Sequence, residues 1–145
     1  GSGMKPLMDT DSERLMQEGI RAGAETFPDF LAECGWSREL LARTVCHQVG
    51  TTHRKLMLEA LGLDEALDYA SVDWLGNTGS VALPLTLALG LERGLVQPGD
   101  RVGLLGIGSG INCLMIAATW QRVLVGTASG PAVPEATGSL LTAAD

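Results

Sequence analysis

Three short stretches of the sequence hold the residues best suited to chemistry. The stretch TVCHQVGTTHRK, residues 44–55, places His47 where an apolar, β-branched run ends. The stretch GNTG, residues 76–79, offers the carboxamide of Asn77, and GSG, residues 108–110, offers backbone amides that glycine leaves open to close approach. An imidazole, a carboxamide and backbone amides can all donate hydrogen bonds to an oxygen that gains negative charge during a reaction.

Taken singly, these residues also have structural interpretations. A histidine at the end of a strand can fill a core, and an asparagine before a turn commonly caps its own backbone. Their order along the chain favours a site, because the carboxyl ends of parallel strands meet at one edge of a sheet and helical crossovers make strands parallel. We therefore expect His47, Asn77 and Ser109 to converge on one cavity.

The glycine-rich stretch LLGIGSG, residues 104–110, does not match the nucleotide-binding or hydrolase motifs. In the dinucleotide pattern GxGxxG, the third glycine would fall at Ile111 or at Cys113. Ser109 is not a nucleophile elbow either, since GxSxG requires glycine where Ile107 stands. A small methyltransferase-like module is kept as an alternative, which S-adenosylmethionine binding by the isolated chain would reveal.

The spacing of cysteine and histidine does not favour a metal site. Cys46 and His47 are adjacent, so they point to opposite faces of an extended strand, and His53 follows on the next helix without further ligands. Cys34 and Cys113 lie within apolar patterns that indicate core thiols. Three cysteines without CxxC spacing fit reduced thiols, so we expect no metal, no disulfide framework and a cytoplasmic protein.

The elements that must position these residues begin with a long amphipathic helix. Apolar residues recur every three or four positions over residues 16–34, and Gly35 supplies a stop signal. Thr10 and Glu13 stand at capping-box spacing and predict where the helix starts. Pro28 predicts a kink or a division into two helices.

Beyond this helix, short strands and helices follow one another. We expect strands at 40–48, within 68–75, at 101–107 and at 111–120, and helices at 51–61 and at 81–93, the second capped by Ser80. The last two strands flank a glycine-rich turn and predict a hairpin, with a buried helix as the alternative for the second run. We expect a flexible lead-in over 1–9, a folded unit over 10–122 and a Pro/Gly/Ala-rich tail over 123–145.

Composition and charge exclude several kinds of partner. The 145 residues, 46% of them hydrophobic and 19 of them glycine, fit one α/β domain or a subunit with a large interface. A formal charge of −7 without a Lys/Arg cluster lacks the electrostatic footprint of a nucleic-acid-binding protein. We see no signal peptide and no apolar run of about 18 residues that could span a bilayer.

Three motifs, in this order, resemble a known family. CHQVGTTHR (46–54), LGNTGSVALPLTLAL (75–89) and QPGDRVGLLGIGSGINCLMIAATW (97–120) resemble the C-terminal half of thiolase-fold condensing enzymes of the ketoacyl-ACP synthase III group. The resemblance covers about residues 10–120. HQVG, GNTGSV and GIGSGIN are most similar to the OleA-type long-chain acyl-CoA condensing enzymes of olefin and β-lactone biosynthesis. It implies a thiolase-like α/β half, a mixed sheet flanked by helices that ends in an antiparallel hairpin.

The resemblance also implies roles for particular residues. His47 and Asn77 match the family's active-site histidine and asparagine, which donate hydrogen bonds to a thioester carbonyl, and the backbone amide of Ser109 matches an oxyanion-hole position. The residues expected to bind substrate are Gly50, Gly108, Gly110 and Ile111. Gly50 stands where the synthase III pattern usually has asparagine, so a pantetheine contact from that side chain is absent. This departure favours the OleA-type resemblance over the carrier-protein-dependent synthases.

The chain lacks a cysteine in the context of the family's nucleophile, which belongs to the N-terminal half of the fold. We therefore expect a companion polypeptide that carries this cysteine and covers an apolar face over residues 80–93, and a higher dimer. The expected reaction is a Claisen condensation of two acyl-CoA thioesters without a cofactor. The alternatives are a decarboxylating 3-oxoacyl-ACP synthase III and a non-catalytic structural or regulatory half.

Overall fold

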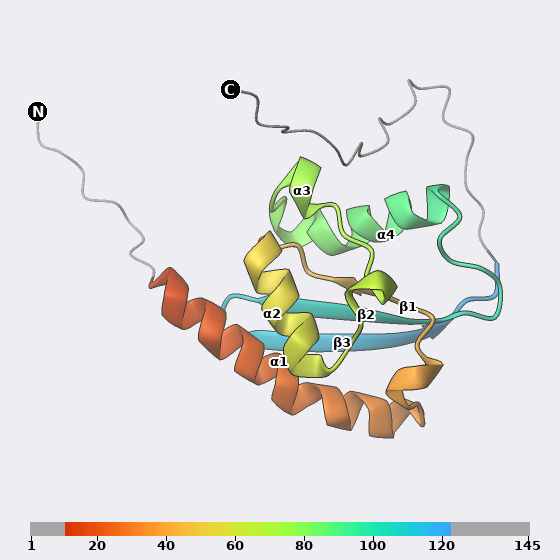
Figure 1. The fold of residues 1–145 in the computed structure, drawn as a ribbon, viewed down its shortest axis with the longest axis horizontal. Helices are drawn as coiled ribbons and strands as arrows, with labels where there is room; N and C mark the ends of the chain where they lie inside the picture. The colour runs from red at the N-terminus through yellow and green to blue at the C-terminus, as the bar shows by residue number, and fades with distance from the viewer. Residues whose placement is uncertain (1–10, 123–145) are drawn as a thin grey trace, which may run out of the picture.

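The computed structural model describes residues 11–122, which fold into a three-stranded sheet with helices on both sides (Figure 1). The elements in chain order are α1 (Ser12–Cys34), η1 (Arg38–Leu40), β1 (Arg43–Cys46), α2 (Thr51–Leu61), η2 (Glu65–Leu67), α3 (Val72–Leu75), η3 (Gly79–Val81), α4 (Ala82–Glu92), β2 (Arg101–Gly108) and β3 (Asn112–Thr119). The expected lead-in over 1–9 and tail over 123–145 lie outside the described residues. Within 11–122, no helix has both the length and the hydrophobicity to cross a membrane.

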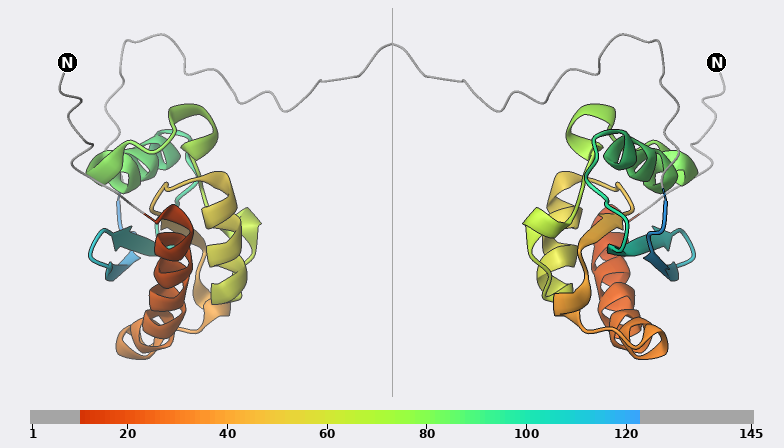
Figure 2. Two further views of the ribbon diagram at one scale, coloured as in Figure 1. Left: turned by 90° about the vertical axis from the view of Figure 1, so that its left-hand side faces the viewer. Right: turned by 90° about the vertical axis from the view of Figure 1, so that its right-hand side faces the viewer.

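The sheet is mixed, with strand order β1-β2-β3. β1 pairs in parallel with β2, so that Cys46 lies opposite Leu105, and β2 pairs antiparallel with β3, so that Gly108 lies opposite Asn112. α1 and α2 cover one side of the sheet, and α4 lies on the other side against β1 (Figure 1 and Figure 2). The predicted mixed sheet and final hairpin are confirmed, and a buried helix over 111–120 is wrong.

The main core lies between α1, α2 and the facing side of the sheet. Its buried members are Phe27, Phe30, Leu31, Leu41, Cys46, Met57, Leu58, Leu61, Leu63 and Leu105. α1 approaches its neighbours closely at Gly19 and Gly23, both buried. A Cβ added at Gly23 would lie 2.7 Å from Sδ of Met57 on α2. The absent side chains therefore let the two helices come together around the core.

The strand predicted within 68–75 is wrong. Only an isolated bridge joins Thr44 to Asp68 there, and the chain then turns into the four-residue helix α3. The Asp68 carboxylate explains the difference, because its Oδ1 accepts from the Cys46 N–H and from Thr44 Oγ1, each at 3.1 Å. On the outer edge of β1, the Asp68 carboxylate thus accepts from the Cys46 N–H, and the Tyr69 N–H donates to the Thr44 carbonyl at 3.0 Å, in place of a neighbouring strand.

α1 differs from its prediction at its start, and it is not divided in two at Pro28. Asp11 caps the helix, accepting from the Arg14 N–H at 3.0 Å, so the expected cap by Thr10 and Glu13 is wrong; Thr10 itself lies outside the described residues. The helix also runs through Pro28 as one element. Pro28 lies on the exposed side, where a carbonyl that loses its helical partner can bond to water instead.

α4 buries its small residues and exposes large ones. Ser80 does not cap it, because η3 occupies residues 79–81 and Val81 stands at the N-cap without a side-chain bond. The buried positions are Ala82, Thr86 and Gly90. Val81 and Leu85 are exposed, as are Leu114 and Ile116 of β3 at 65% and 49%. The expected exposure of apolar side chains on this helix is therefore observed, and it extends to β3.

Candidate active site

His47 is the first residue after β1, and the sheet still holds its backbone. Its N–H donates to the Leu105 carbonyl at 2.9 Å, which continues the parallel ladder by one residue beyond Cys46. The side chain is half-buried. Removal from water disfavours the charged form, so burial lowers the pKa of His47 and keeps the ring neutral near pH 7. A neutral imidazole has one N–H to donate and one nitrogen to accept.

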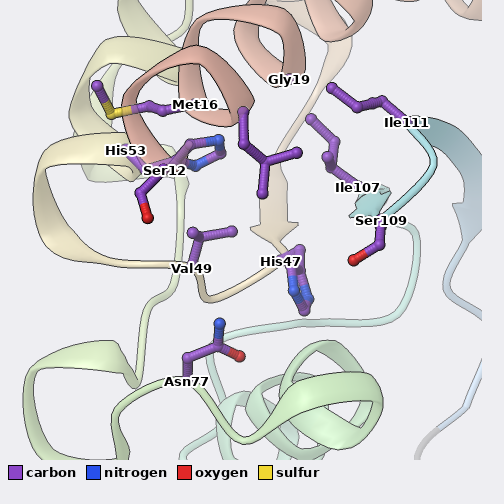
Figure 3. A pocket seen from close by; sticks show the side chains of 12 residues that line it. Ser12, Met16, Gly19, His47, Val49, His53, Asn77, Ile107, Ser109 and Ile111 are labelled. Atoms are coloured by element: carbon purple, nitrogen blue, oxygen red, sulfur yellow. The ribbon is translucent and has the colours of Figure 1, made fainter. Parts of the chain in front are cut away.

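Asn77 follows α3 and its terminal Gly76, whose φ of +65° lies in the region that favours glycine. The Asn77 Oδ1 accepts from the Gly79 N–H at 2.9 Å, which closes a local turn. Because the oxygen is engaged in this way, the amide nitrogen is the atom directed into the pocket, as Figure 3 shows. Asn77 therefore presents a hydrogen-bond donor there, although it follows a helix and not the predicted strand.

The third component is the turn between β2 and β3. Ser109 follows β2, and its carbonyl accepts from the Asn112 Nδ2 at 2.9 Å. Gly110 has a φ of +144°, and a Cβ there would lie 2.5 Å from the same Nδ2. The turn therefore requires glycine at this position, and Gly110 supports the turn without lining the pocket.

One pocket of about 260 Å³ brings the predicted residues together (Figure 3). Its lining residues are Ser12, Leu15, Met16, Gly19, His47, Val49, His53, Asn77, Ile107, Gly108, Ser109 and Ile111. A neighbouring pocket of about 510 Å³, bounded also by α4 and β3, shares His47, Asn77 and Ser109 with it. The expected convergence of imidazole, carboxamide and glycine-rich turn is therefore present, with His47 at the junction of two cavities.

Gly50 does not line either of these pockets. It is the N-cap of α2 in an extended conformation, with φ 176°, and no atom lies within 4 Å of the place where a Cβ would stand. Glycine is therefore not required there by the fold.

His53 is a pocket residue that the sequence reasoning missed. It lies in the first turn of α2, is 8% exposed, and its Nε2 would be 3.6 Å from a Cβ added at Gly19 of α1. Burial, and to a lesser degree the nearby His47, lower the pKa of His53. The sequence signal for this placement is that His53 lies six residues after His47, in the first turn of the helix that follows the strand.

The cysteines contribute no nucleophile to these pockets. All three lie within residues 11–122 as free thiols, and neither pocket is lined by any of them. Burial, reinforced by Asp68, raises the pKa of the Cys46 thiol well above its usual value, so the reactive thiolate is disfavoured. Within the same residues, no group of three or more His, Cys, Asp or Glu side chains is arranged to hold a metal ion.

Comparison with known protein families gives one family model, described as the C-terminal part of 3-oxoacyl-[acyl-carrier-protein] synthase III, which matches residues 31–120. An acyl-CoA:acyl-CoA alkyltransferase of Shewanella oneidensis is 40% identical over 80% of this chain. A protein of the same description from Xanthomonas campestris is 37% identical over 78%. In both cases the chain spans 33% of the relative's length.

Solved structures agree with this likeness. The synthase III FabH of Pseudomonas aeruginosa superposes with a TM-score of 0.76 over 84% of this chain and 40% of its own, at 23% identity, which supports the fold alone. A crystal structure of OleA from Xanthomonas campestris superposes with a TM-score of 0.73 at 37% identity, over 77% of this chain and 32% of OleA. The thiolase-like fold expected from the motifs is therefore confirmed.

Proposed function

Because the chain belongs to the 3-oxoacyl-[acyl-carrier-protein] synthase III family, we propose that it forms part of the active site of an enzyme that condenses two acyl-CoA thioesters to a β-keto product. The observation that carries this proposal is the shared pocket of His47, Asn77 and Ser109. The identities of 40% and 37% to the acyl-CoA:acyl-CoA alkyltransferases, against 33% and 25% to two synthase III relatives, support two acyl-CoA substrates over a carrier-protein substrate.

The proposed chemistry is a Claisen condensation. A base, which we assign to the companion part together with the cysteine, takes a proton from the α-carbon of one thioester, and the resulting charge is delocalised onto the carbonyl oxygen. The α-carbon then attacks the carbonyl of an acyl group held on the cysteine. His47 and Asn77 each direct an N–H donor at the enolate oxygen, and the low pKa of His47 keeps its ring in the neutral form. Fixed donors in a site shielded from water stabilise such charge without having to reorganise.

The acyl group that is attacked needs its own oxyanion hole. We assign one donor of that hole to the backbone amide of Ser109, because the glycine-rich turn lies at the edge of both pockets. Gly108 and Ile111 line the first pocket beside it and would contact the thioester. Departure of the cysteine thiolate would then release the β-keto thioester.

The nucleophilic cysteine is assigned to a companion part of the protein. Three observations support this: neither pocket is lined by a cysteine, the chain spans about a third of its relatives' length, and apolar side chains of α4 and β3 are exposed. Burying those side chains would favour association with the missing part of the fold. We extend the proposal to a dimer of the completed unit.

Reconstitution with the companion part tests the proposed function. The assembled protein is supplied with acyl-CoA alone, or with acyl-CoA and malonyl-ACP, and β-keto product and CO₂ are measured while intact-mass analysis follows acylation of a thiol. Product from acyl-CoA alone, without CO₂, is the expected result. CO₂ release that requires malonyl-ACP would support a decarboxylating synthase III instead. Product formation at the same rate with and without this chain would contradict the proposal.

A further inference from the structure

Gln48 lies directly after His47, yet its side chain points away from the pockets into the protein. It is 2% exposed and lines neither pocket. Its Nε2 donates to the Cys46 carbonyl at 2.6 Å, and its Oε1 accepts from the N–H groups of Ser71 and Val72 at 2.9 and 3.0 Å. One buried carboxamide thus joins the end of β1 to the start of α3.

The two bonds at α3 replace a cap that the helix does not supply itself. Ser71 stands at the N-cap, but its side chain makes no capping bond and pairs instead with Thr86 Oγ1 of α4 at 2.5 Å. The first N–H groups of a helix have no partner within the helix. Gln48 accepts from the N–H groups of Ser71 and Val72 from another element, so the position of α3 depends on this residue.

α3 is four residues long, and Asn77 follows its terminal Gly76 directly. Because the helix is so short, a displacement of its first residue should also displace Asn77. At the other end, Gln48 binds the carbonyl of Cys46, the residue before His47. The same side chain is therefore attached to the two segments that present the imidazole and the carboxamide.

We propose that Gln48 is a positioning residue that fixes His47 and Asn77 relative to one another. This inference rests on the proposed function for its effect on rate, but its effect on geometry can be measured without any activity. A misplacement of about 1 Å in a catalytic group can cost about 10²-fold in rate. A residue that only filled the core would affect stability and leave the geometry of the pair unchanged.

Two substitutions separate these roles. Gln48→Met keeps the length of the side chain and removes all three hydrogen bonds. Gln48→Glu keeps an oxygen that accepts from α3 and loses the donor to the Cys46 carbonyl, so it should hold Asn77 better than Gln48→Met does. Gln97→Met is the matched control, because Gln97 is exposed and bonds only to the Gly94 carbonyl among the side-chain bonds described.

Nuclear magnetic resonance of the full 145-residue chain gives the direct readout. The sequence has two histidines and two asparagines, so the His47 ring and the Asn77 side-chain amide can be assigned with single variants. Gln48→Met should shift both sets of signals, Gln48→Glu should shift mainly the His47 signals, and Gln97→Met should shift neither. Unchanged His47 and Asn77 signals in Gln48→Met would overturn the proposal.

Kinetics of the reconstituted enzyme give the second readout. Gln48→Met should lower kcat by about 10²-fold with little change in KM, since the substrate contacts remain. Leu41→Ala, which opens the core before β1, supplies a variant of reduced stability whose kcat should stay near the original. If Gln48→Met loses no more rate than Leu41→Ala while His47→Ala is inactive, the positioning role is wrong and the proposed function stands. If His47→Ala is also active, the proposed function itself fails.

Discussion

The His47 N–H donates to the Leu105 carbonyl at 2.9 Å, one residue beyond the last pair of the parallel ladder between β1 and β2. This bond fixes the position of His47 along β2. β2 continues for three residues beyond Leu105 and ends at Gly108, and the turn begins at Ser109. The parallel register therefore explains why the imidazole and the glycine-rich turn occur at one edge of the sheet.

The ion pair between Arg54 and Asp68 should stabilise this edge. Arg54 Nε donates to Asp68 Oδ2 at 2.6 Å, and the Asp68 side chain is completely buried. Asp68→Asn would remove the carboxylate of this pair while Arg54 keeps its bonds to the Glu65 and Asp68 carbonyls, and we expect the free energy of unfolding to fall by about 1–3 kcal/mol. Urea denaturation measures it. Glu65→Gln is the control: Glu65 is 53% exposed at 3.6 Å from Arg54, and should cost about 1 kcal/mol or less.

Gly50→Asn should be accepted by the fold and should raise activity toward pantetheine thioesters. No atom lies within 4 Å of the position of a Cβ, and asparagine is a favourable helix N-cap, so the melting temperature should not decrease. If an asparagine here contacts pantetheine, which CoA and the carrier protein share, kcat/KM should rise for acyl-CoA and for a carrier-protein thioester alike. Unchanged kcat/KM values for both substrates would contradict the assignment of Gly50 to substrate binding.

Gly19 and Gly23 should respond differently to alanine. A Cβ at Gly19 would make ordinary contacts of 3.6 Å or more, so the helix-forming gain of alanine, about 0.5–1 kcal/mol, should appear as added stability. A Cβ at Gly23 would lie 2.7 Å from Met57 Sδ. The flexible end of the buried Met57 side chain must move to make room, so Gly23→Ala should gain less stability than Gly19→Ala. Thermal unfolding of both variants measures the difference, and equal stabilisation would contradict the close packing of α1 on α2.

The two histidines should make stability depend on pH. Burial lowers the pKa of His47 and of His53, so below about pH 6.5 the unfolded chain binds protons that the folded chain still excludes. The free energy of unfolding should be fully retained above this pH and fall as pH decreases toward the folded-state pKa values. The double variant His47→Gln, His53→Gln should lose this slope.

Comparison with the double variant is needed because the titration of Asp68 has the opposite effect: it raises the free energy of unfolding as the pH falls. Burial raises the pKa of Asp68 despite its bond to Arg54, so the folded chain takes up that proton first as the pH falls. The contribution of Asp68 is common to both proteins and cancels in the difference. A slope near pH 6 that is identical in both proteins would contradict the assignment to the histidines.

Local signals predicted much of the fold. The bounds expected for α2 agree with Thr51–Leu61, and its stop at Gly62 is correct, because a left-handed glycine ends a helix through backbone geometry alone. The hairpin of β2 and β3 was likewise predictable from two apolar runs about a glycine-rich turn. That His47 and Ser109 lie at the same edge of the sheet was predictable because the two strands that precede them were expected to be parallel.

Long-range contacts explain what could not be predicted. The apolar run at 68–75 has the composition of a strand, but the Asp68 side chain occupies the edge of β1 and Gln48 holds the start of α3. No local pattern shows that a carboxylate 22 residues away will accept from the Cys46 N–H. The inclusion of His53 in the pocket likewise depends on how closely α1 approaches, which the side-chain-free Gly19 decides.

The rate of β-keto product formation by the reconstituted enzyme, measured with His47→Ala and with Asn77→Ala, tests the central claim most directly. Each substitution removes one donor from the shared pocket, and we predict a loss of about 10²- to 10³-fold in kcat for either. Far-ultraviolet circular dichroism would establish that both variants remain folded. Rates close to that of the unsubstituted enzyme in either folded variant would contradict the account.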